Sequence, residues 1–213
     1  MLKDYWKKTH EIYSKKDWIN NTTIFAQFAL GYFPKRGKLL DLGAGQGQDS
    51  RYFAKLGYDV ISTDTSDFAL KLSKENAKKD GLNLKIIKLD TSEKLHFKDN
   101  SFDIVYSHMA LHYFTNEKTR EVFREIHRIL KPDGILACIC NTIKDPESKD
   151  LSYALIEEDY YKTAEGLLKR YFSVKYMRQV TKNLFIPIVL DSRGETYKDE
   201  IKSLIRFIGK ANK

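Results

Sequence analysis

The sequence predicts an α/β protein in which helices cover both faces of a mostly parallel β-sheet. Three observations lead to this prediction. Short apolar runs of strand length alternate with amphipathic helical segments across residues 38–139, the pattern of repeated βαβ units. The first apolar run, at residues 39–42, leads into glycines at positions 43, 45 and 47, which is typical of a strand-to-helix turn. A chain of 213 residues is long enough for one domain with a substantial core.

Composition and charge narrow the class of protein. No apolar run approaches the ~18 residues that cross a bilayer, and residues 1–16 lack the apolar core of a signal peptide. We therefore expect a cytoplasmic protein with no membrane partner. The net charge of +8 is compatible with nucleic-acid binding, but the lysines are scattered, which favours a solvated basic surface. Cys138 and Cys140 alternate within one apolar run, too close for an ordinary disulfide, and no Cys/His set suggests a metal site.

Aromatic residues concentrate in the N-terminal segment. Residues 24–32 carry apolar side chains at helical spacing behind a polar cap at residues 20–22, which predicts a helix packed against the sheet. Tyr5, Trp6 and Tyr13 come before that helix. These three side chains can form a lid over a bound ligand instead of packing on the sheet.

The glycine turn is the most informative stretch. A helix is predicted at residues 47–56, with Gly57 as its stop, so free N–H groups and the positive end of a helix dipole lie just behind the turn. Asp41 lies two residues before Gly43, at the end of the strand. A carboxylate there suits a ligand that presents a cation and sits badly beside a pyrophosphate. The stretch Asp41 to Gly47 resembles the first motif, D/E-x-G-x-G-x-G, of the class I S-adenosylmethionine-dependent methyltransferases.

The next strands place further polar groups at the same edge of the sheet. A strand at residues 58–63 ends at Asp64, which follows Gly43 by 21 residues and can accept both hydroxyls of a ribose. A helix at residues 68–79 and a strand at residues 84–89 lead to Asp90, where the resembled family has an acid that meets the adenine amino group. His96 replaces the proline of the family's L-P-F step at residues 95–97, a departure from its pattern.

The resemblance continues through the fourth and fifth strands. Residues 103–114 are similar to the family's D-x-V-x-x…A-L-H-x-F segment, and residues 128–134 resemble a turn common in the family. Between them we predict a helix at residues 116–130, followed by a strand at residues 135–139. The fourth strand flanks the topological switch point, so the residues after it should face the ligand crevice.

The last third of the chain has no family motif, so its elements are predicted from hydrophobic patterns alone. We predict a loop at residues 145–148, a helix at residues 157–170, two strands at residues 173–180 and 184–190, and a final amphipathic helix at residues 196–209. The two strands fit the closing antiparallel pair of the family's sheet. The resemblance implies a Rossmann-like three-layer α/β/α sandwich with a mostly parallel seven-stranded sheet and an antiparallel C-terminal strand. We predict a single methyltransferase domain at residues 1–213 with three parts. Residues 1–36 form an N-terminal helical cap, residues 37–142 form the cofactor-binding core, and residues 143–213 complete the sheet and add the last helix.

The resemblance also implies a cofactor and a chemistry. S-adenosylmethionine would bind without metal and leave as S-adenosylhomocysteine after methyl transfer to a small-molecule acceptor. His112 and His108 follow the fourth strand and are candidate general bases, although a soft or ionised nucleophile needs none. The candidate substrate residues are Tyr5, Trp6, Tyr13 and Tyr113. The candidate cofactor-binding residues are Asp41, Gly43, Ala44, Gly45, Gly47, Asp64, Thr65, Asp90, Thr91 and Ser107.

Three other functions stay open. A nicotinamide-dependent oxidoreductase also uses a βαβ unit, but the glycine spacing and Asp41 disfavour it. An RNA methyltransferase fits the charge and the basic, aromatic residues 169–182, yet no separate RNA-binding module is evident. Enzymes that methylate exocyclic amino groups of bases typically carry D/N-P-P-F/Y after the fourth strand, where residues 107–110 read S-H-M-A. The third open function is that of a cofactor-binding protein without catalytic activity. We expect a monomer or homodimer.

Overall fold

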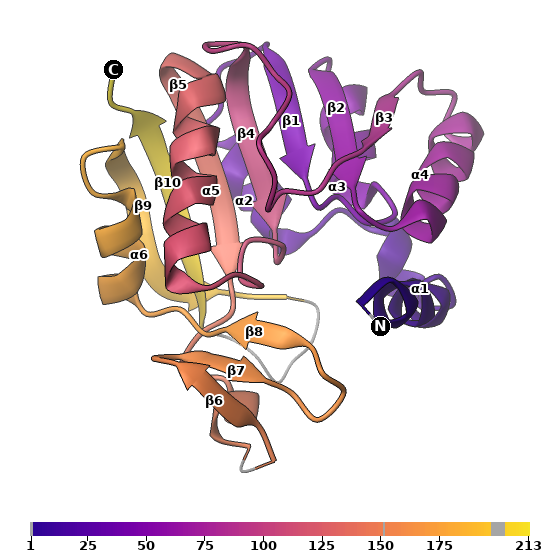
Figure 1. Cartoon of the computed structure of the whole chain (residues 1–213). Coiled ribbons are helices and arrows are strands. Elements are labelled where there is room, and N and C mark those ends of the chain that lie inside the picture. Colours follow the sequence, from indigo (N-terminus) through magenta and orange to yellow (C-terminus); the bar gives the residue numbers. More distant parts are fainter. Residues whose placement is uncertain (1, 151, 197–202) are drawn as a thin grey trace.

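The computed structural model describes residues 2–150, 152–196 and 203–213. A seven-stranded sheet forms its centre, in the order β3-β2-β1-β4-β5-β10-β9 (Figure 1). Strands β1 to β5 are parallel, and β10 runs antiparallel to both of its neighbours, so the predicted sheet is confirmed. The strands are β1 (Lys38–Leu42), β2 (Asp59–Asp64), β3 (Lys85–Lys88), β4 (Phe102–His108), β5 (Leu130–Cys140), β9 (Phe185–Gly194) and β10 (Leu204–Ala211).

Two hydrophobic cores lie on the two faces of this sheet, because side chains alternate along each strand. On β1, Leu40 and Leu42 belong to one core and Leu39 to the other. The first core is covered by α5 (Asn116–Ile129) and α6 (Val174–Thr181), and the second by α2 (Ile24–Leu30) and α3 (Gln48–Lys55). These layers make the three-layer sandwich, with α4 (Asp67–Lys79) packed on β2 and β3 (Figure 1).

Two elements lie beside the sandwich, at the edge of the sheet where the parallel strands end. Helix α1 (Leu2–Tyr13) lies below α4 in the view of Figure 1, and a small antiparallel sheet lies below β4 and β5. That sheet contains β6 (Ala154–Glu157), β7 (Tyr160–Lys162) and β8 (Leu168–Arg170). Two short 3-10 helices, Asp17–Asn20 and Pro146–Lys149, complete the described elements.

The predictions for the last third of the chain were partly wrong. The predicted helix at residues 157–170 is β7, β8 and the end of β6, because turns with positive φ at Asp159 and Gly166 reverse the chain twice. The predicted strand at residues 173–180 is helix α6, which begins at the side-chain cap of Ser173 on the Tyr176 N–H, at 3.0 Å. The strand predicted at residues 184–190 is confirmed as β9.

The predicted final helix at residues 196–209 was also wrong. Residues 197–202 lie outside the described part of the chain, and the remainder forms β10. Ile205 and Phe207 belong to one core, whereas Leu204 and Ile208 belong to the other. Apolar residues on both faces of a buried strand imitate the spacing of an amphipathic helix over so short a segment. The C-terminal region therefore completes the sheet without a last helix among its described residues.

Candidate functional site

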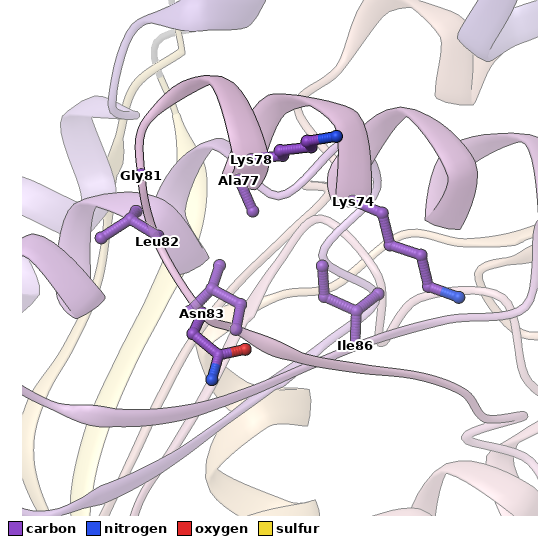
Figure 2. Close-up of a pocket in the computed structure, with 8 residues that line it drawn as sticks. Lys74, Ala77, Lys78, Gly81, Leu82, Asn83 and Ile86 are labelled. Carbon is purple, nitrogen blue, oxygen red and sulfur yellow. The ribbon is translucent and has the colours of Figure 1, made fainter.

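The carboxyl ends of the parallel strands open into a cavity of about 1130 Å³. Its walls come from the ends of β1, β2, β4 and β5, from α1, and from β8 with the loops beside it. A smaller cavity of about 370 Å³ lies between the end of α4 and β3, where Lys74, Lys78 and Asn83 project from its rim (Figure 2). None of the predicted site residues lines the smaller cavity, so the large cavity is the candidate site.

The glycine turn bends tightly at one end of the large cavity. Gly43, Gly45 and Gly47 have φ of 72°, 56° and 75°, in the left-handed region that favours glycine. A Cβ on Gly43 would overlap the Cβ of Ala110, which follows β4. The Ala44 N–H donates to the Thr63 carbonyl at 2.7 Å and ties the turn to β2. The missing side chains thus allow both the positive φ of the turn and the close approach of Ala110, His10 and Ser73 to its backbone.

Asp41 is a buried carboxyl beneath this turn. Its Oδ2 accepts a hydrogen bond from the Ser50 hydroxyl at 2.6 Å. Burial raises the pKa of Asp41 to about 8, and the negative charges of Asp49 and Asp64 add to this effect. The carboxyl is therefore mainly neutral at pH 7, and a cation placed beside it would favour its ionised form.

Asp64 and Asp90 line the same end of the cavity. Asp64 accepts the Gly45 N–H at 2.9 Å and the Ser66 N–H at 2.8 Å, one on each oxygen, and each oxygen keeps a further lone pair for a ligand. Asp90 accepts the N–H and hydroxyl of Ser92 on one oxygen only. The cavity brings together eight of the predicted cofactor residues: Asp41, Gly43, Ala44, Gly45, Asp64, Thr65, Asp90 and Thr91.

Gly47 and Ser107 do not line this cavity. Gly47 precedes α3 and lies against Ser73 of α4, where a Cβ would overlap the Ser73 hydroxyl. Ser107 is fully buried, and its hydroxyl donates to the Leu42 carbonyl at 2.9 Å, which joins β4 to β1. Both residues therefore support the structure around the turn. The predicted contact of the Ser107 backbone with the cofactor stays a prediction.

A second part of the cavity wall, which we call the aromatic end, adjoins the glycine turn at α1, where His10 lies over Gly45 with its ring centroid 6.2 Å from that of Trp6. All of the predicted substrate residues line it, as do both histidines. Trp6 of α1 packs edge-to-face on Tyr113, with ring centroids 5.2 Å apart, and Tyr113 lies 4.4 Å from the ring of His112. Tyr13 packs on Trp18 at 5.1 Å. Helix α1 therefore contributes aromatic rings to the wall of the cavity, as a lid would.

Burial lowers the pKa of His108 and holds that of His112 well below its ordinary value, with the nearby Lys169 charge adding to the effect on His112. Both imidazoles are therefore neutral near pH 7. The backbone N–H of Asn141 points to His112 Nδ1 at 3.5 Å, a long contact that leaves the proton on Nε2. In that tautomer His112 Nε2 donates a hydrogen bond and does not accept a proton, so a role as general base stays a prediction that this geometry disfavours.

Asp49 and His10 are among the polar groups of the cavity wall that sequence reasoning missed. Asp49 accepts hydrogen bonds from the N–H and hydroxyl of Thr23, at 2.8 and 2.7 Å, and from the Tyr106 hydroxyl at 2.7 Å. His10 of α1 lies over Gly45, and its carbonyl accepts the Gln46 side-chain amide at 2.9 Å. Asp49 could have been predicted as a site residue, because it is an acid in the first turn of the helix that follows the glycine turn. The spacing of residues in α1 does not indicate His10.

Comparisons with known proteins agree with this geometry. Residues 40–138 match the family model of the methyltransferase domain. An uncharacterised methyltransferase of Synechocystis sp. is 35% identical over 48% of this chain and 46% of its own length. A probable S-adenosyl-L-methionine-dependent methyltransferase, TehB of Haemophilus influenzae, is 27% identical over 61% of this chain and 46% of its own length.

A solved structure extends the likeness to nearly the whole fold. The 1,6-didemethyltoxoflavin-N1-methyltransferase of Burkholderia thailandensis, bound to 1,6-didemethyltoxoflavin and S-adenosylhomocysteine, aligns with a TM-score of 0.76 over 99% of this chain and 85% of that one, at 16% identity. The chain spans about half the length of the curated relatives that it matches. With the glycine motif and the sheet order in agreement, residues 40–138 form a methyltransferase domain similar to those of S-adenosylmethionine-dependent methyltransferases.

Proposed function

We propose that this protein transfers a methyl group from S-adenosylmethionine to a small-molecule acceptor bound in the same cavity. One observation carries the proposal. A single cavity is lined both by a glycine turn with buried and partly buried carboxyl groups and by a set of aromatic side chains. The glycine-turn end suits a ligand with a cation and a ribose, and the aromatic end suits an apolar acceptor.

The residues at the glycine-turn end fit the parts of this cofactor. Asp41 would hold the positively charged methionine end, directly or through water, because its carboxyl lies buried at that end. Asp64 would accept the ribose hydroxyls, since each of its oxygens has a free lone pair beside the turn. Asp90 and Thr91 would meet the adenine. When bound, the cofactor supplies a sulfonium methyl group that is already strongly electrophilic.

The chain itself contributes binding, orientation and the exclusion of water. Trp6 and Tyr113 form a wall from two remote segments, so water is displaced from the acceptor when the aromatic end is filled. The neutral His112 would orient the acceptor by donating a hydrogen bond. Small molecules are also the substrates named for relatives, among them sarcosine and dimethylglycine for the N-methyltransferase of Aphanothece halophytica. We infer the same class of acceptor here.

The test is a turnover screen that measures release of S-adenosylhomocysteine. Pools of small metabolites and, in parallel, total RNA would be offered with S-adenosylmethionine. We expect turnover with a small-molecule pool that is lost in Asp64→Ala, whereas Asp59→Ala, at the exposed start of the same strand, should keep it. Salt-sensitive methylation of RNA without activity on any small-molecule pool would overturn the proposed acceptor class. It would also assign the +8 charge to nucleic-acid binding.

A further inference from the structure

Two nitrogen-bearing side chains form a cluster at the aromatic end of the cavity, which we call the amide–imidazole pair: Asn141 and His112. Asn141 follows the end of β5, and His112 follows β4, the neighbouring parallel strand. Both side chains are almost fully buried, with exposed fractions of 2% and 1%, and both residues line the cavity. The backbone N–H of Asn141 makes a long contact, at 3.5 Å, with Nδ1 of His112.

The pair has hydrogen-bonding capacity that the described protein does not use. The buried Nδ2 of Asn141 has no hydrogen-bond partner among the described residues. The side chain of His112 can offer Nε2–H, because its Nδ1 faces the Asn141 N–H. Buried polar groups in folded proteins nearly always have a partner, so an unpartnered amide beside a cavity indicates a missing ligand or water.

The acidic groups at this end are engaged by the protein. Asp145 accepts the Glu147 N–H at 3.0 Å. Glu147 pairs with Lys169, and the Tyr171 hydroxyl contacts it at 3.4 Å. The buried Asn141 Nδ2 is a donor that a hydrogen-bond acceptor would satisfy, and the ammonium of Lys169, itself on the cavity wall, adds to that preference.

We propose that the methyl acceptor is a small aromatic compound that carries a carbonyl or carboxylate oxygen, and that the amide–imidazole pair binds this oxygen. The aromatic side chains Trp6, Tyr13 and Tyr113 contact the ring, while Asn141 Nδ2–H and His112 Nε2–H donate to the oxygen. Asn141 is then a specificity-determining residue that separates oxygen-bearing from amine-bearing ligands. This inference rests on the proposed function, because it assigns the acceptor end of the same cavity.

The experiment uses three probes that share a phenyl ring: the planar pair benzoate and benzamide, and the cationic benzylamine. Their binding to the full chain is measured by ligand-detected NMR and calorimetry, with and without saturating S-adenosylhomocysteine. We expect benzoate and benzamide to bind more tightly than benzylamine. Asn141→Asp replaces the amide donor by a carboxylate of the same shape and should weaken benzoate by about tenfold or more and favour benzylamine.

Control variants and outcomes separate the alternatives. Asn83→Asp makes the same chemical change at the smaller cavity (Figure 2) and should leave all three affinities unchanged. Asn141→Ser provides a second variant if Asn141→Asp does not fold, and should weaken benzoate and benzamide alike. Benzylamine binding most tightly to the unaltered chain, or probe affinities that both Asn141 variants leave unchanged, would overturn the inference. Failure of S-adenosylhomocysteine itself to bind would instead refute the proposed function.

Discussion

The two ends of the cavity are built in different ways. The glycine-turn end comes mostly from one short stretch of chain, residues 41–65, and depends on backbone conformation: three glycines with positive φ and two strands that end side by side. The aromatic end comes from α1, the segment after β4, the end of β5 and strand β8, and depends on side-chain packing. One end is thus local in sequence and the other is assembled by the fold, so substitutions should affect them differently.

The largest expected effect lies in the small sheet beside the aromatic end. Arg170 is buried between the rings of Tyr160 and Tyr176, donates to the carbonyls of Phe114 and Glu158 at 3.0 Å each, and pairs with Glu157. Arg170→Met would leave these acceptors without a hydrogen-bond donor and should lower the free energy of unfolding by about 3–5 kcal/mol. Lys162→Met, at the exposed last residue of β7, is the control for urea unfolding. A loss below about 1 kcal/mol would show that side-chain bonds do not hold this end.

The matching change at the glycine-turn end acts through the backbone. Gly43→Ala places a Cβ against Ala110 at a φ of 72° and should cost roughly 2–4 kcal/mol of stability while it abolishes cofactor binding. Gly57→Ala is the control, because its φ of 90° is also positive but no atom lies within 4 Å of the new Cβ. It should cost only about 1–2 kcal/mol and leave cofactor affinity intact. If the two variants lose the same stability and the same cofactor affinity, the close contact between Gly43 and Ala110 has no special role.

A charge change at the same end should affect binding more than stability. Asp64→Asn removes the charge and puts an amide NH₂ in place of one acceptor oxygen, so either the Gly45 or the Ser66 N–H loses its acceptor, and we expect S-adenosylhomocysteine to bind about 1.5–3 kcal/mol more weakly in calorimetric titration. Asp59→Asn, at the exposed start of β2, should leave the affinity unchanged. An unaltered affinity in folded Asp64→Asn would mean that the ribose lies elsewhere.

The smallest effect is expected at α1. Trp6→Ala removes the edge-to-face contact with Tyr113 and should weaken acceptor binding by about 1 kcal/mol, which is measured as a higher KM for the acceptor. The cofactor affinity should change little. Ile12→Ala, which lies on the same helix with 58% of its surface exposed, should leave steady-state kinetics unaltered. A loss of cofactor affinity in Trp6→Ala as large as that of KM would mean that α1 serves the cofactor and not the acceptor.

The same contrast explains what could be predicted from the sequence. The glycine turn, Asp64 and Asp90 were predictable because motif and strand ends are close in sequence, and the cavity brings them together. The strand β10 and helix α6 were not, because Ile205, Phe207 and the apolar residues of α6 have spacings that suit either structure until tertiary packing decides. Asn141 and His10 were missed because only the folded chain brings them to the cavity.

The titration of Asp41 tests most directly whether the glycine-turn end holds a cationic cofactor. The ligand-free carboxyl has a pKa raised to about 8 and is mostly protonated at pH 7, and a neighbouring cation lowers that pKa, so binding should release a proton. Calorimetric titration with S-adenosylmethionine at pH 7, in buffers of different ionisation enthalpy, measures that release directly.

We expect release approaching one proton with S-adenosylmethionine. The release should be smaller with S-adenosylhomocysteine, which lacks the sulfonium charge, and should fade by about pH 9, where Asp41 is already ionised. Asp41→Asn should abolish it. Binding of NAD without binding of S-adenosylmethionine, or S-adenosylmethionine binding with the same proton release in Asp41→Asn as in the unaltered chain, would contradict this account.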